Sequence, residues 1–222
     1  DLERFREICM KVLVETDPTI SLDETERLLA KIRGIGLIYS KHIRKALVET
    51  LALLGSWAEN TNLSTLQLKQ WNYEAIYLVR DILKDHSPDR WITLSSLLRL
   101  LAEASPESFL DALENDLSSE SPSCMKMFKD IDDTGFFPSS PHTGLLWALE
   151  NIAWNPKYHT RASFVLVRLS LLDKGGSLSN RPFGSLINIY KAWNPQSSAS
   201  TEQRINALKS TIKKFTALSK KL

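Results

Sequence analysis

Residues 143–172 read TGLLWALENIAWNPKYHTRASFVLVRLSLL, and apolar side chains recur in them every three or four positions. This spacing is that of one face of an α-helix, because residues three and four apart lie on the same side of it. The dipeptide Asn155-Pro156 divides the stretch, with asparagine as N-cap and proline at the first helical position, where its missing amide costs no hydrogen bond. Thr143 is placed to cap the earlier helix. The stretch therefore predicts two helices joined at a tight corner.

The same corner signals recur along the chain. Ala-Trp-Asn-Pro occupies 153–156 and again 192–195, a spacing of 39 residues, and Ser105-Pro106 repeats the combination of a cap and a proline. Two further helix starts, at Ser21 and Ser200, have the capping-box pattern of serine followed three residues later by Glu or Gln. A spacing near 40 residues is typical of two-helix repeats, which bury their apolar faces against neighbouring repeats.

Helical spacing covers nearly the whole chain, and no segment alternates convincingly like a β-strand. We therefore predict an all-α chain of stacked helical hairpins, similar to a HEAT or tetratricopeptide α-solenoid, with a compact helical bundle as the alternative. Residues 1–117 are expected to form N-terminal hairpins and residues 142–222 C-terminal hairpins of one continuous array. Residues 118–141, rich in serine and proline, are expected to form a surface loop and seam between them, with one or two helical turns.

Composition narrows the class of protein. The chain has 222 residues, with 28 Lys and Arg against 26 Asp and Glu, so it is no polyelectrolyte. No apolar run reaches the roughly 18–20 residues of a membrane helix, so no membrane association is expected. Two cysteines do not form a disulfide framework, and the start Asp1-Leu2-Glu3-Arg4 has no apolar signal segment. We expect a cytoplasmic protein. A mature protein could also begin in this way, but an excised domain is the simpler interpretation.

Motifs for catalysis or cofactor binding are absent from the sequence. There is no G-x-x-x-x-G-K-[ST] phosphate loop and no G-x-S-x-G nucleophile elbow. Residues 130–135 imitate the start of a calcium loop, but Pro141 stands where a glutamate ligand is required. The four histidines have no metal-ligand spacing, although His142 or His159 could serve an unrecognised enzyme if a carboxylate lay beside it. We expect no cofactor, no metal ion and no enzymatic activity.

Two groups of residues are candidates for binding a partner. Aromatic residues cluster around the first corner, at Trp147, Trp154 and Tyr158, where they either pack between hairpins or anchor a partner. Basic residues gather on the last helix, and Lys213 and Lys214 could join Arg161 and Arg168 in contacting phosphates. They could equally keep a terminal helix solvated. These are the candidate partner-binding residues: Trp147, Trp154, Tyr158, Arg161, Arg168, Lys213 and Lys214.

The corner motifs also carry a resemblance to a known family. The segment Ser139-Ser140-Pro141-His142-Thr143-Gly144-Leu145-Leu146-Trp147, continuing to Tyr158, resembles the helical region of large bacterial STAND-type NTPases, and so do Asn180-Arg181-Pro182 and Trp193-x-Pro195-Gln196. The resemblance covers roughly residues 1–210. It implies a non-catalytic helical-repeat scaffold that senses a ligand or binds a protein, with nucleotide-binding motifs elsewhere in a larger chain. Some members act in antiphage defence. A nucleic-acid-binding helical repeat is the alternative function.

Overall fold

The computed structural model describes residues 2–30, 32–60, 66–85, 87–128, 141–176 and 180–219. In this part of the chain every regular element is a helix and none is a strand, which confirms the all-α prediction. The α-helices are α1 (Leu2–Leu13), α2 (Glu24–Ala30), α3 (Lys41–Asn60), α4 (Leu66–Ile82), α5 (Pro88–Thr93), α6 (Leu98–Ala104), α7 (Pro106–Leu117), α8 (Pro141–Trp154), α9 (Pro156–Leu172), α10 (Pro182–Tyr190) and α11 (Thr201–Ser219). The 3-10 helices are η1 (Pro18–Ser21), η2 (Ser95–Leu97) and η3 (Ser123–Phe128).

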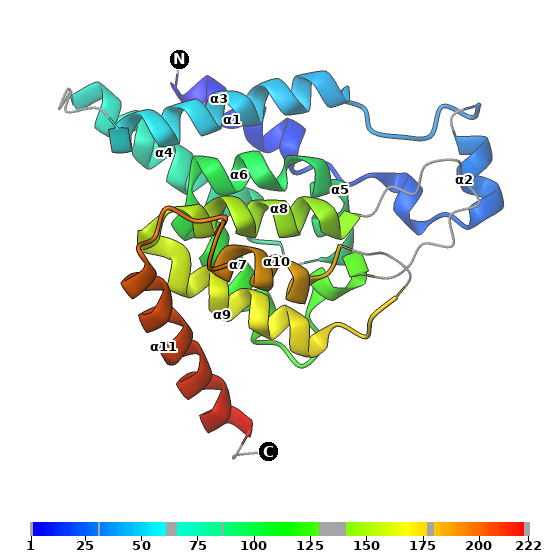
Figure 1. Cartoon of the computed structure of the whole chain (residues 1–222). Helices are drawn as coiled ribbons and strands as arrows, with labels where there is room; N and C mark the ends of the chain where they lie inside the picture. Colours follow the sequence, from blue (N-terminus) through cyan, green and yellow to red (C-terminus); the bar gives the residue numbers. More distant parts are fainter. Residues whose placement is uncertain are drawn as a thin grey trace.

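The long helices form two rows. In one row α3 contacts α6, α6 contacts α8 and α8 contacts α10; in the other, α4 contacts α7, α7 contacts α9 and α9 contacts α11. Figure 1 shows α3, α6 and α8 lying one below another, with α11 leaning away from the body toward the C-terminus. Consecutive helices of opposite rows also pack together, as α8 does on α9. This order of contacts is the one that stacked hairpins predict. Membership of the HEAT or tetratricopeptide class, rather than a compact bundle, stays a prediction.

Neighbouring helices approach closely at two glycines. A Cβ atom on Gly55 of α3 would overlap the backbone carbonyl of Ala104 at the end of α6. A Cβ atom on Gly144 of α8 would overlap the carbonyl of Ser95 in η2. Because backbone atoms are the obstacle in both places, rotation of a side chain would not relieve the clash. Glycine is therefore required at both positions, so that α3 can approach the end of α6 and α8 can approach η2.

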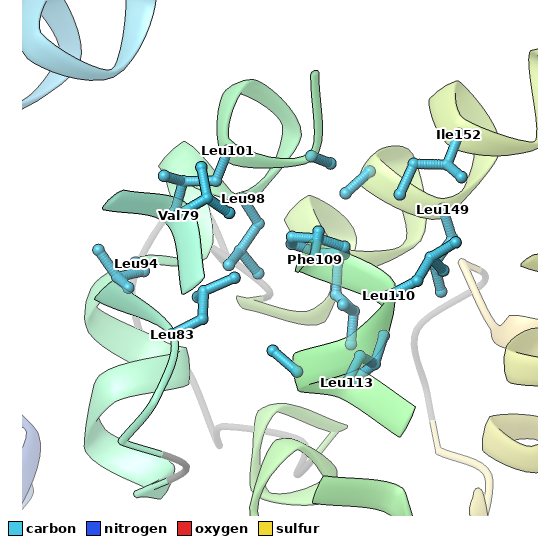
Figure 2. Packing of buried hydrophobic residues seen from close by; sticks show 14 of the residues in the cluster. Val79, Leu83, Leu94, Leu98, Leu101, Phe109, Leu110, Leu113, Leu149 and Ile152 are labelled. Carbon is cyan, nitrogen blue, oxygen red and sulfur yellow. The ribbon is translucent and has the colours of Figure 1, made fainter. Parts of the chain in front are cut away.

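A single buried cluster lies between the rows and extends along the chain from Cys9 to Ile189. Figure 2 shows part of it, with Leu98 and Leu101 of α6, Phe109 of α7 and Leu149 of α8 among the buried side chains. Each fully buried leucine stabilises the fold by about 1.5–3 kcal/mol relative to an exposed one. The apolar spacing read from the sequence is thus the spacing of this core.

The segment expected as a surface loop contributes to that core. Cys124, Met127 and Phe128 of η3 are buried, and η3 packs against α5, α7 and α8. The buried carboxylate of Asp116 at the end of α7 holds the turn, since it accepts hydrogen bonds from the amides of Ser123 (3.0 Å) and Cys124 (2.8 Å). The surface-loop prediction is therefore wrong for residues 123–128. Residues 129–140, including the calcium-loop-like sequence, lie outside the described residues.

Three predicted helix starts are confirmed. Asn155 accepts a hydrogen bond from the Lys157 amide (3.0 Å), and Ser105 accepts one from the Ser108 amide (3.4 Å). At Ser200 the capping box is reciprocal: its hydroxyl accepts from the amide of Gln203, whose side chain accepts from the Ser200 amide.

Other predicted boundaries are wrong. Ser21 closes η1 by donating to the Pro18 carbonyl, and it is Asp23 that caps α2 by accepting from the Glu26 amide (2.8 Å). Helix α8 begins at Pro141, two residues before the predicted cap at Thr143.

Candidate functional site

Two tryptophans lie exposed on one face of α8. Trp147 and Trp154 are seven residues apart, which is two helical turns, and their exposed fractions are 55% and 56%. Glu150 and Asn151 lie between them on the same face. The interpretation of these rings as packing between hairpins is therefore wrong. Trp193 is also exposed, at 86%, beyond the end of α10.

The two rings border a groove of about 440 Å³. We call it the tryptophan groove; its lining residues are Arg99, Trp147, Glu150, Asn151, Trp154 and Gln196. Arg99 comes from α6, the neighbour of α8 in the first row. Gln196 comes from the segment after α10, and its amide donates to the Asn188 carbonyl (3.1 Å). The groove thus joins parts of the chain that are almost 100 residues apart in sequence.

Hydrogen bonds hold the segment after α10 against the end of α8. The hydroxyl of Ser197 donates to the Ala153 carbonyl (2.9 Å), while the amide and the hydroxyl of Ser198 both donate to the Trp154 carbonyl (2.9 and 2.7 Å). The last carbonyls of a helix have no intrahelical partner, so these serines satisfy groups that would otherwise need water. As a result, one wall of the tryptophan groove is fixed in place.

Tyr158 does not share this exposed surface. Only 3% of it is exposed, and it belongs to the buried cluster. Its hydroxyl accepts a hydrogen bond from Lys157 Nζ (2.9 Å), whose ammonium also lies over the tyrosine ring. The core interpretation of this aromatic residue is the correct one, so its side chain is not available to anchor a partner.

Of the candidate cations on α9, Arg161 is already paired with acids. Arg161 donates to both carboxylate oxygens of Glu114 (3.1 and 2.8 Å) and to Asp111 (2.7 Å), which ties α9 to α7. These bonds to Glu114 and Asp111 raise the pKa of Arg161. Arg168 is half-buried on α9. Because two acids already neutralise Arg161, it is poorly placed to bind phosphate.

Lys213 and Lys214 lie exposed on α11. Lys214 Nζ is 4.1 Å from the centre of the Phe164 ring on α9, a cation–π contact. Phe164 in turn packs edge-on against Phe215. These lysines therefore belong to the surface of α9 and α11, and they do not line the tryptophan groove.

His159 is the centre of a buried polar cluster that the sequence did not reveal. Its Nδ1 lies 3.0 Å from the Ala153 carbonyl and 3.1 Å from the Ser197 hydroxyl, and its ring packs edge-on against Tyr190. The Tyr190 hydroxyl is 2.8 Å from that of Ser163. Burial lowers the pKa of His159. Since Ser197 is 38 residues away, no local motif could have signalled the pair.

His142 is also buried and bonded to backbone. Its Nε2 donates to the Asn180 carbonyl (2.8 Å), and its ring stacks on Phe128. It lies in the first turn of α8. Nε2 of His142 and Nδ1 of His159 thus each face a backbone carbonyl.

Both cysteines are free and buried. Burial raises the pKa of the Cys9 thiol to about 12, and it raises that of Cys124 further, with the Asp116 carboxylate adding to the shift. Among the described residues, no three His, Cys, Asp or Glu side chains gather as a metal site would require. In the same part of the chain, no helix combines the length and the apolar character needed to cross a membrane.

A wider, more polar hollow of about 710 Å³ lies on another face, between η1, the start of α3 and α5. Its charged lining residues are Asp17, Arg27, Lys41, Arg44, Asp89 and Lys126. Arg44 is buried there, and it donates to the Val12 carbonyl (2.6 Å) and lies 3.5 Å from Glu15. Arg44 therefore binds the carbonyl end of α1 and the carboxylate that follows it, a contact that the sequence did not predict.

Comparisons of the chain with protein-family models, with curated proteins and with solved structures find no match. The resemblance to STAND-type NTPases consequently stays a prediction, and the function must be argued from the surfaces described above.

Proposed function

We propose that the chain is a non-catalytic helical-repeat module that binds a protein partner through the tryptophan groove. Following the resemblance, the partner would be a neighbouring domain, or a ligand sensed by a larger bacterial NTPase. The observation that carries the proposal is the exposure of Trp147 and Trp154 on one face of α8.

The two rings supply enough apolar area to anchor a partner. A tryptophan buries roughly 150–250 Å², so covering the exposed halves of two rings removes on the order of 200 Å² from water. At about 25 cal/mol per Å² this is about 5 kcal/mol before the costs of association. Tryptophan is among the residues that contribute most to protein interfaces, especially when it lies at the centre of a contact.

The polar residues of the groove favour a protein over a phosphate backbone. Arg99 offers donors, Glu150 offers acceptors, and the amides of Asn151 and Gln196 offer both. The two charges have opposite sign, so the groove has no net charge with which to attract a polyanion. A partner surface with mixed polar groups around an apolar centre would match it.

Peptides selected from a random display library on the purified protein provide the test. We expect Trp154→Ala and Trp147→Ala each to weaken the selected peptides by at least about tenfold, which is 1.4 kcal/mol. Leu53→Ala is the matched control, because Leu53 is 66% exposed on α3 and lies outside the groove. Peptides that bind the tryptophan variants as tightly as the parent, or a selection that yields none, would refute the proposal.

Nucleic-acid binding through α11 is the second candidate, and the exposure of Lys213 and Lys214 favours it. The engagement of Arg161 with Glu114 and Asp111 counts against it. If this candidate is right, the protein binds a single-stranded oligonucleotide, and the affinity falls steeply as the salt concentration rises. The affinity should also fall in the double variant Lys213→Gln, Lys214→Gln.

A further inference from the structure

A second groove, almost wholly apolar, lies between α9, α10 and α11. Its volume is about 440 Å³. We call it the C-terminal groove; its lining residues are Val167, Ser170, Leu171, Phe183, Leu186, Tyr190, Leu208, Thr211, Ile212 and Phe215. It shares no residue with the tryptophan groove, so the two surfaces can be tested independently.

Helix α11 has two apolar faces, of which one is covered. Ala207 and Thr211 are buried where α11 packs on α9. The adjoining face carries Leu208 and Ile212, which are 43% and 58% exposed. Across the groove, Phe183 of α10 is 62% exposed. Since large apolar residues on both walls remain open to water, the groove is suited to receive an apolar ridge from outside.

Basic residues outnumber acids in the part of the chain that forms this groove. Residues 162–222 contain ten Lys and Arg but only two acids, whereas residues 1–161 contain 18 Lys and Arg and 24 acids. One of the two acids, Asp173, is already paired with Arg181 (3.1 Å). Lys209 and Lys213 are exposed and each follow a groove residue by one position, so they lie along the solvent side of the exposed apolar face of α11. Their charges are therefore available to a partner.

We infer that the C-terminal groove binds an amphipathic helix of a protein partner, with acidic residues flanking its apolar face. Groove walls made of helices accept a helix whose apolar residues recur every three or four positions. The groove residues of α11 run from Leu208 to Phe215, about 10 Å at 1.5 Å per residue, so two to three turns of partner helix would cover them. Charge complementarity selects an acidic helix, because like charges across an interface are costly.

The probe is a synthetic amphipathic peptide of about 14 residues, with leucines at helical spacing and glutamates on the flanks. We expect its binding, measured by fluorescence anisotropy, to weaken at least about tenfold when lysines replace its glutamates. Ile212→Asp should weaken the acidic peptide at least as much, because it places a carboxylate on the apolar floor. The double variant Lys209→Glu, Lys213→Glu should also weaken binding of the acidic peptide, and this loss should be larger at low salt than at high salt.

Matched controls separate the groove from general effects. Leu53→Asp places the same charge on exposed α3, and the pair Lys11→Glu, Lys126→Glu makes the same charge change outside the groove. Both control proteins should bind the acidic peptide as the parent does. Equal affinity for the acidic and basic peptides, unchanged binding in Ile212→Asp, or no binding at all would overturn the inference.

Two other occupants have distinct outcomes, and either would overturn the inference. A second copy of the chain would show as self-association in sedimentation, abolished by Ile212→Asp. If a nucleic acid is the occupant, an oligonucleotide would compete with the acidic peptide for the lysines, and its own binding would be unchanged in Ile212→Asp. The tryptophan variants should leave acidic-peptide binding unchanged, so a failure of the proposed function and a failure of this inference give different results.

Discussion

Helices α8 and α10 have similar sequences and different surroundings. Each begins at a proline, has a glycine in its first turn and leads to Ala-Trp-Asn-Pro. Gly144 of α8 meets the backbone of Ser95, whereas a Cβ atom on Gly184 of α10 would meet nothing within 4 Å. Helix α8 has a neighbour on either side within its row, and α10 contacts only α8 among the described helices of that row. Position in the stack therefore determines what equivalent residues contact.

The two tetrapeptides differ in the same way. Asn155 caps α9, which starts at once, whereas the helix after Asn194 starts only at Thr201. After Pro195 come Gln196-Ser197-Ser198-Ala199-Ser200, and serine side chains compete with helical hydrogen bonds. Two of these serines satisfy the end of α8 instead. The segment after the second tetrapeptide thus completes the first corner, and no helix starts directly after Asn194.

Exchanging each glycine for alanine tests the difference in surroundings most strongly. Gly144→Ala should destabilise the fold by about 3 kcal/mol, because the new methyl group would overlap backbone that cannot rotate away. Gly184→Ala should be neutral or stabilise by up to about 1 kcal/mol, through helix propensity alone. Urea unfolding midpoints of the two variants measure both effects. If the variants were equally stable, the close approach of α8 to η2 would be wrong.

The two asparagines provide a smaller test. We expect Asn155→Ala to cost about 1 kcal/mol, because the Lys157 amide loses its acceptor. Asn194→Ala should change the free energy of unfolding by less than about 0.5 kcal/mol, since no helix starts there. Thermal and urea unfolding of both variants would check this. Equal losses would mean that the second tetrapeptide caps a helix after all.

The smallest effect concerns pH, through His159 beneath the first corner. Burial lowers its pKa below the ordinary 6.5, and Arg204 adds to the shift against the Ala153 hydrogen bond. The unfolded chain therefore takes up a proton near pH 6.5 before the folded chain does, and stability should fall as the pH is lowered from 6.5 toward the folded pKa. The slope of unfolding free energy against pH should be smaller in His159→Asn. An unchanged slope in that variant would assign the pH dependence to other groups.

Local signals account for the predictions that are confirmed. Asn155-Pro156, Ser105-Pro106 and the Ser200 capping box each involve residues within four positions of one another, so the sequence contains the whole interaction. The apolar spacing of α8 and α9 likewise matches the buried cluster. Errors arose where two polar residues compete for one helix start, as Ser21 and Asp23 do.

The candidate site was only partly predictable for the same reason. Trp147, Trp154 and Tyr158 lie within 12 residues and have equal apolar character, yet two are exposed and one is buried. Arg161 looked like a free cation because Glu114 is 47 residues away. The C-terminal groove gave no signal, since it depends on how far α11 lies from α10.

The helices, the corners that join them and the all-α class are determined by local sequence, because capping and periodic burial act over one or two helical turns. Which apolar faces are covered is a property of the folded molecule alone. The burial of η3, the exposure of the tryptophans and the opening beside α11 each depend on neighbours far away in sequence. The hydrophobic effect is non-directional, so an apolar stripe in the sequence does not specify which segment covers it. The packing of the helices determines which apolar faces stay exposed and can bind a partner.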